Sequence, residues 1–211
     1  VQVKHEHPNS RWYSGAGIYR NVWFIKKHNK RIEPNGVYVK TNYQEKSILI
    51  DTKLSHKNGK VRNDLFYDGK LVATQTTKYD EYNNKQLLRL KEIFLWTPDY
   101  PLLYELETVL IIDGIEYDKV IQKIGFKDIV MDSQKGLLIN GEKEKLRGVC
   151  EHHDFGSLGS AFSKELQKNR FKLLKQMGVN AIRTAHYVPS IDFMNLADEM
   201  GFLIVSDAFD T

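Results

Sequence analysis

The chain has 211 residues, of which 41% are hydrophobic and 27% are charged, and its formal net charge is +4 at pH 7. These values are typical of a globular protein of one or two domains. No run of lysine and arginine is long enough to indicate a nucleic-acid partner, and no apolar run approaches the ~20 residues of a membrane span. The single cysteine, Cys150, excludes an internal disulfide and leaves the compartment open.

The first 30 residues combine an aromatic loop with an apolar run. The loop at residues 9–17 holds glycines, an arginine and two large aromatic residues, which suit stacking on a sugar and packing at a sheet edge equally well. Residues 18–25 predict a strand. The basic run at residues 26–31 predicts a solvated linker.

Residues 31–124 alternate with period two. Apolar side chains recur on one face of residues 46–54 and again on one face of residues 104–112. Asn-Gly or Asp-Gly pairs at residues 58–59, 68–69 and 113–114 predict tight turns. About seven short strands within ~90 residues indicate an immunoglobulin-like β-sandwich.

After residue 125 the pattern changes to alternating strands and helices. Residues 136–141 predict a hairpin with an Asn-Gly turn, and strands are expected at residues 146–150, 179–182 and 202–205. One helix begins at Ser163 and a second at Pro189, and the second ends at Gly201. In the first helix the side chains expected to point inward are Leu166, Leu173, Leu174 and Met177. The order β-α-β-α-β indicates the start of a parallel α/β domain.

Polar side chains gather where the predicted strands end. His152 follows the first strand, Arg183 ends the second, and His186 lies in the loop after it. Strand alternation places His152 and Arg183 on converging faces, with Val149 and Ile182 toward the helices. Because ligands bind at the carboxyl edge of parallel sheets, the sequence predicts a ligand site here.

Four stretches resemble glycoside hydrolase family 2, in particular its β-galactosidase branch. Residues 10–22 are similar to the end of the family's sugar-binding jelly-roll, and residues 95–104 to a late strand of its sandwich. Residues 146–154 resemble the first barrel strand with its loop, and residues 180–205 the family's signature segment. The resemblance implies the end of a jelly-roll domain at residues 1–30 and an immunoglobulin-like sandwich at residues 31–124. It implies the first part of a (β/α)8 TIM barrel at residues 125–211.

The resemblance implies a retaining β-glycosidase that hydrolyses terminal β-galactosides. Such enzymes use two glutamates about 5 Å apart, one as acid/base and one as nucleophile. In the family both lie on later barrel strands, which would place them beyond Thr211 and make this chain an inactive fragment. Arg183 then matches the arginine beside the nucleophile, His186 the histidine after it, and His152 the first-loop histidine near the sugar.

The sequence departs from the family pattern at two places. Val188 stands where the family has proline, and Ser206 with Asp207 stands where it has Asp-Glu. Asp207 is grouped with His152, Arg183 and His186 as part of the active-site shell, but the departure leaves its role open. The resemblance implies a carbohydrate substrate and no cofactor, and it leaves open a divalent cation and a homo-oligomer in the full enzyme.

Two alternatives remain at this point. A metal-dependent barrel hydrolase would use His152, His153, Asp154, His186 and Asp207, although alternation sends His152 and His153 to opposite faces. A non-catalytic carbohydrate-binding or structural module would explain the sandwich, but the β-α-β pattern argues against a pure sandwich module.

Overall fold

The computed structural model describes residues 2, 4 and 17–207, and the chain divides into two compact units. One unit runs from Ile25 to Glu144. The other joins the segment that ends at Phe24 to the residues from Lys145 onward. A segment that precedes the first unit in the chain therefore belongs with residues that follow it.

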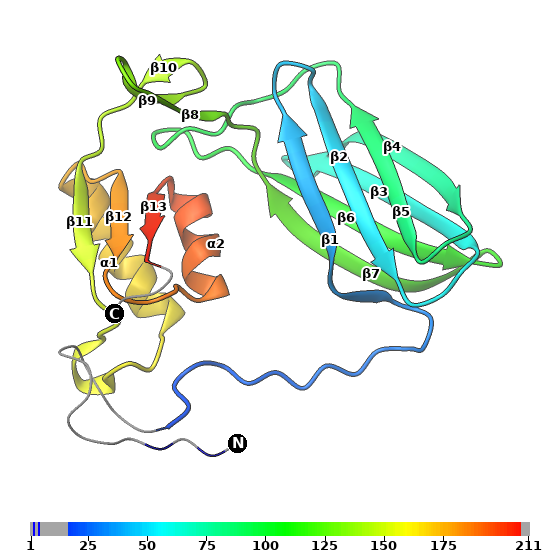
Figure 1. The fold of residues 1–211 in the computed structure, drawn as a ribbon, viewed down its shortest axis with the longest axis horizontal. Coiled ribbons are helices and arrows are strands. Elements are labelled where there is room, and N and C mark those ends of the chain that lie inside the picture. The colour runs from blue at the N-terminus through cyan, green and yellow to red at the C-terminus, as the bar shows by residue number, and fades with distance from the viewer. Residues whose placement is uncertain (1, 3, 5–16, 208–211) are drawn as a thin grey trace. The chain divides into compact units, whose positions relative to one another are not determined.

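The unit of residues 25–144 contains a β-sandwich of two antiparallel sheets (Figure 1). Its strands are β1 Ile32–Asn42, β2 Ser47–Leu54, β3 Gly59–Tyr67, β4 Lys70–Tyr79, β5 Asn83–Arg89, β6 Tyr104–Ile112 and β7 Ile115–Ile124. One sheet has the order β1-β2-β5 and the other β4-β3-β6-β7. The immunoglobulin-like sandwich predicted from the alternating pattern is confirmed.

Alternation along the strands builds the core of this sandwich. In β2, Ile48 and Ile50 are buried, while Leu49 between them is exposed. The tight turns follow from residues that tolerate positive φ. Asp68 and Gly69 have φ of 48° and 70°, and Asp113 and Gly114 have φ of 52° and 82°. Two consecutive positive φ angles are what a type I′ hairpin turn requires.

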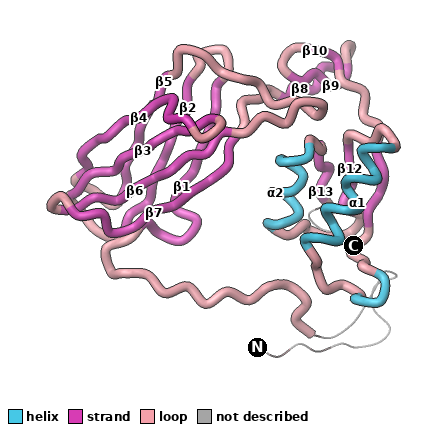
Figure 2. Tube along the Cα trace, turned by 180° about the vertical axis from the view of Figure 1, so that it is seen from behind, coloured by secondary structure: helices cyan, strands magenta, loops and turns pink. Residues whose placement is uncertain are grey.

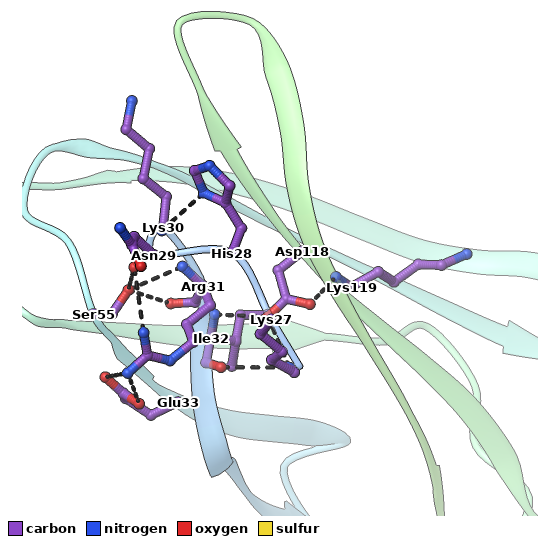
Figure 3. Close-up of polar contacts among 10 residues, drawn as sticks. All are labelled: Lys27, His28, Asn29, Lys30, Arg31, Ile32, Glu33, Ser55, Asp118 and Lys119. Atoms are coloured by element: carbon purple, nitrogen blue, oxygen red, sulfur yellow. Dashed lines mark hydrogen bonds and ion pairs between the residues drawn. The ribbon is translucent and has the colours of Figure 1, made fainter. Parts of the chain in front are cut away.

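The basic run before β1 is tied to the sandwich. Lys27 Nζ pairs with the Asp118 carboxylate at 2.8 Å, and the same carboxylate accepts a hydrogen bond from the Ile32 N–H at 2.9 Å (Figure 3). Arg31 pairs with Glu33 at 3.1 Å. The run is a loop in which residues 26–29 are exposed, as a solvated linker requires, and its cations also pair with carboxylates of β1 and β7.

A small hairpin follows the sandwich and packs with it. It consists of β8 Ile129–Asp132, β9 Gly136–Ile139 and β10 Glu142–Lys143, in the order β10-β9-β8. Asn140 in its turn donates a hydrogen bond to the Trp96 carbonyl at 3.0 Å and accepts one from the Asp128 N–H at 2.9 Å. The predicted hairpin is present as β9 and β10, and it belongs to the same compact unit as the sandwich. The domain boundary expected at residue 125 stays a prediction.

The second unit contains a parallel sheet with helical crossovers. Its elements are β11 Gly148–Glu151, the 3-10 turn η1 Gly156–Leu158, α1 Lys164–Gln176, β12 Ala181–Thr184, α2 Ile191–Met200 and β13 Leu203–Ser206. The strands pair in parallel in the order β11-β12-β13. Figure 2 shows α1 and α2 beside these strands. The predicted order β-α-β-α-β is present.

Local signals fix the helix ends. Ser163 Oγ accepts a hydrogen bond from the Leu166 N–H at 3.4 Å, and Ser190 Oγ accepts one from the Phe193 N–H at 3.2 Å. Ser190 is therefore the N-cap of α2, one residue after the expected start at Pro189. Gly201 ends α2 with a left-handed φ of 74°, as predicted.

The buried face of α1 differs from the prediction. Phe171 is fully buried among Phe193 and Phe202, and Leu174 packs against the same cluster. The other three side chains expected to point inward are exposed: Leu166 by 44%, Leu173 by 61% and Met177 by 73%. The helix carries two adjacent apolar stripes, and the one that contains the aromatic ring faces the sheet because Phe171 buries the larger apolar area.

The described part of the apolar run at residues 18–25 forms no strand. Val22, Trp23 and Phe24 are exposed by 79%, 73% and 94%. The strand expected there is therefore wrong for this structure, since a strand needs a partner for its backbone N–H and C=O groups. The aromatic loop at residues 9–17 lies outside the described residues except for Gly17.

Candidate active site

The three parallel strands end at one edge and bring the predicted residues there. His152 directly follows β11, Asp207 directly follows β13, and Arg183 is the second-last residue of β12. Cys150, Arg183 and Val205 are in register on one face of the sheet. The opposite face carries Val149, Ile182 and Ile204, which pack with the helices, and Val149 and Ile182 were predicted to do so.

Arg183 and Asp207 form a two-point ion pair. The Arg183 Nε donates to Asp207 Oδ1 at 3.2 Å, and Nη2 donates to Oδ2 at 2.7 Å. This fork-to-carboxylate geometry fixes the orientation of both groups. Hydrogen bonding to the Cys150 thiol and to Asp207 raises the pKa of Arg183 above its ordinary value. The sequence placed both residues at this edge but did not predict that they pair.

His186 approaches the same carboxylate from the loop after β12. Its backbone N–H donates to Asp207 Oδ2 at 3.4 Å, and its Nδ1 lies 3.6 Å from that oxygen. The His186 ring lies 5.4 Å from the His152 ring. His186 has a φ of 75°, a left-handed conformation that is uncommon for residues other than glycine and recurs at functional sites. The structure thus brings His152, Arg183, His186 and Asp207 together.

A second group of aromatic rings surrounds His153. The ring of His153 lies 4.8 Å from Tyr187, 5.1 Å from Tyr19 and 5.9 Å from Phe155. Burial, and after it the positive charge of Arg20, lowers the pKa of His153 below its ordinary value. Burial raises the pKa of Tyr187. Sequence reasoning missed this cluster, although two successive ring residues after each of two strands signal that one of each pair points inward.

Glu151 faces away from the site, as its position in the strand predicts. Only 7% of its side chain is exposed, and it forms an ion pair with Arg170 of α1. Arg170 also donates to the Asp154 carbonyl at 2.7 Å. Glu151 therefore links the end of β11 to α1 and does not reach the edge where His152 and Arg183 meet.

The described residues do not support the metal-dependent alternative. Within residues 17–207 the side chains of His, Cys, Asp and Glu form no group of three that could hold a metal ion. His153 points into the ring cluster, and Asp154 Oδ1 accepts a hydrogen bond from the Gly156 N–H at 2.8 Å.

Among the described helices, none is long and apolar enough to cross a membrane.

An immunoglobulin-like sandwich followed by β/α units, with polar residues gathered at their carboxyl edge, is typical of multidomain proteins of the β/α-barrel type. Two family models agree with this class. "Glycosyl hydrolases family 2" matches residues 29–127, and "Glycosyl hydrolases family 2, TIM barrel domain" matches residues 130–209. The chain belongs to glycosyl hydrolase family 2, and its parallel strands are the start of a TIM barrel.

Named relatives and solved structures agree with this family. A β-galactosidase of Bacteroides ovatus is 34% identical over 97% of this chain and 26% of its own length. The crystal structure of a β-glycosidase from Bacteroides vulgatus has a TM-score of 0.83 and 32% identity, over 96% of this chain and 27% of that one. A β-glucuronidase structure from Bacteroides uniformis has a TM-score of 0.82 and 26% identity, over 96% and 27%. The chain thus spans about a quarter of the length of these relatives.

Proposed function

We propose that this chain is part of a retaining β-glycosidase that hydrolyses terminal β-galactosides. The family and the similarity to the B. ovatus β-galactosidase support the proposal. In this proposal residues 1–30 end a sugar-binding jelly-roll domain, residues 31–124 are the sandwich, and residues 125–211 begin the catalytic barrel. The two catalytic glutamates lie on barrel strands beyond Thr211, and the substrate is the carbohydrate partner.

The single observation that carries the proposal is the arrangement of Arg183, Asp207 and His186 at the edge of the parallel strands. Asp207 holds the guanidinium of Arg183 by two hydrogen bonds of 3.2 and 2.7 Å. A guanidinium fixed beside the nucleophile keeps that carboxylate ionised, because an opposite charge within ~4–6 Å lowers a carboxyl pKa by 1–3 units. His152 and His186 then face the sugar.

The sugar itself is decided by a comparison of substrates. The structural relatives include a β-glucuronidase, so the galactose assignment needs this test. The full-length enzyme is assayed on chromogenic β-galactoside, β-glucuronide and β-mannoside. We expect the β-galactoside to have the highest kcat/KM by ~100-fold or more, because a site built to bind one sugar's polar groups rejects analogues that leave them unpaired. A preference for either other substrate contradicts the assignment.

A further inference from the structure

Two residues from the start of the described chain contact the loops that carry the candidate site. The ring of Tyr19 lies 5.1 Å from the ring of His153. The guanidinium of Arg20 donates a hydrogen bond to the backbone carbonyl of Val188, which is 168 positions away in the sequence. The sandwich lies between these residues in the chain, yet both contacts fall within one compact unit.

In each of the two site loops, residues 152–154 and 186–188, one ring belongs to the candidate site and the next ring belongs to the cluster around His153. His152 and His186 face each other at 5.4 Å, while His153 and Tyr187 pack together at 4.8 Å. Consecutive residues share one stretch of backbone, so a contact that holds His153 or the backbone next to Tyr187 also limits where His152 and His186 can lie.

Tyr19 and Arg20 together contact both loops. Tyr19 packs on His153, which follows His152, and Arg20 holds the carbonyl two residues after His186. Arg20 also lies over the Tyr19 ring at 5.6 Å, so the two side chains support each other. The strained left-handed φ of 75° at His186 needs such surrounding contacts to persist.

We propose that Tyr19 and Arg20 are positioning residues that clamp the loops of residues 152–154 and 186–188 and thereby set the distance and orientation of His152 and His186. The clamp belongs to the segment before the sandwich, so this segment completes the barrel site. The contacts stand on the structure alone, whereas the catalytic consequence rests on the proposed glycosidase function.

The first test uses the 211-residue chain and follows each histidine by NMR titration. The groups that act on the His153 ring are Arg20, Arg170, Tyr19, Tyr187, Phe155 and the Ser160 backbone. Arg20→Met removes a positive charge that disfavours the imidazolium, so we expect the pKa of His153 to rise toward its ordinary value. Lys26→Met removes an exposed positive charge that lies only six residues further along the chain but belongs to the sandwich unit, so it is the control and should leave His153 unchanged.

Two further measurements guard against a folding defect. The ring signals of His28 and His56, in the sandwich unit, should stay the same in every variant. Tyr19→Leu should shift the ring signals of His153 because the neighbouring ring current is lost, while the charge of Arg20 remains. A His153 titration that Arg20→Met leaves unchanged, or ring signals that Tyr19→Leu leaves unchanged, overturns the clamp.

The second test uses the full-length enzyme. Arg20→Met should lower kcat/KM by ~10-fold or more, since a displacement of about 1 Å in a positioned group can cost up to 100-fold. Arg20→Lys, which keeps a donor and the charge, should restore part of the loss, and Lys26→Met should have no effect. Unchanged kinetics in an active Arg20→Met enzyme overturns the positioning role. An enzyme without any β-glycosidase activity overturns the proposed function instead, and the NMR result still decides the clamp.

Discussion

At the scale of single residues, the carboxylate of Asp207 is the point on which the candidate site converges. Arg183 contributes two hydrogen bonds and the His186 backbone contributes a third. These groups come from the ends of two neighbouring parallel strands, so the pairing of β12 with β13 fixes their spacing. The geometry depends on a planar guanidinium that can meet both carboxylate oxygens at once.

Arg183→Lys in the full-length enzyme should lower kcat by ~10-fold or more while KM changes less. Lysine keeps the charge but cannot reproduce the fork, so the cation would no longer be held in the orientation that serves the transition state. Steady-state kinetics on an aryl β-galactoside measures both constants. Arg147→Lys is the control, because Arg147 donates to the Gly178 carbonyl at 3.0 Å, away from Asp207. A raised KM with an unchanged kcat would assign Arg183 to sugar binding.

We call the unit that joins the segment ending at Phe24 to the residues from Lys145 onward the barrel unit. Glu151→Gln should destabilise this unit by roughly 1–3 kcal/mol, because a nearly buried carboxylate would no longer neutralise Arg170. Glu165→Gln, at an exposed position of the first turn of α1, should cost only a few tenths of a kcal/mol. Urea denaturation followed by circular dichroism gives both values. Equal losses in the two variants would contradict the importance of the Glu151–Arg170 pair.

The sequence was sufficient to place His152, Arg183 and His186 at one edge, because alternation and strand order fix that edge. It could not show that Arg183 pairs with Asp207, because the contact joins residues 24 positions apart and depends on how β13 pairs with β12. The contact of His153 with Tyr19 was missed for a similar reason. Tyr19 is 134 residues away from His153, and no local pattern encodes such a contact.

At the scale of elements, the hydrophobic pattern of α1 predicted a helix correctly and its buried face incorrectly. Gln167, Phe171 and Leu174 form the stripe that faces the sheet, although Gln167 is polar. Leu166, Leu173 and Met177 form the neighbouring stripe, which the described residues leave exposed. The spacing of apolar residues predicts an amphipathic helix, but in α1 two neighbouring stripes both have helical spacing, so the spacing alone does not show which stripe is buried. Tertiary packing around Phe171 decides between them.

Phe171→Ala should lower the stability of the barrel unit by ~3–5 kcal/mol, the usual cost of removing a fully buried aromatic side chain. Leu173→Ala, on the exposed stripe, should cost less than about 1 kcal/mol. Thermal or urea unfolding of the two variants measures the difference. If Leu173→Ala proves the more damaging substitution, the face predicted from the sequence is the buried one.

At the scale of the whole molecule, the chain combines two units that differ in strand pairing and in the size of the apolar core. The sandwich of residues 25–144 pairs its strands within two sheets and buries a continuous apolar core. The barrel unit has three parallel strands and a smaller core around Phe171 and Ile182. A unit with its own core can fold by itself, so the sandwich does not need the barrel residues.

Residues 25–144 expressed alone should therefore unfold in one cooperative transition. Its midpoint should match that of the sandwich in the 211-residue chain, because the core of this unit draws on residues 32–126. Differential scanning calorimetry on both proteins tests this. Asp118→Ala is an informative variant, since it frees Lys27 and the Ile32 N–H together and should lower the midpoint in both. A segment that shows no cooperative transition would contradict its independence.

The 211-residue chain by itself should hydrolyse no β-galactoside. A retaining glycosidase needs two carboxyl groups about 5 Å apart, one ionised as nucleophile and one protonated as acid. The carboxylates near the described strand ends are already engaged: Asp207 by Arg183, Glu151 by Arg170 and Asp154 by the Gly156 N–H. Turnover of an activated aryl β-galactoside should stay at the buffer rate, with the full-length enzyme as the positive control. Activity that co-purifies with the chain and disappears in Asp154→Asn or Asp207→Asn would show that a different pair of carboxylates performs the chemistry.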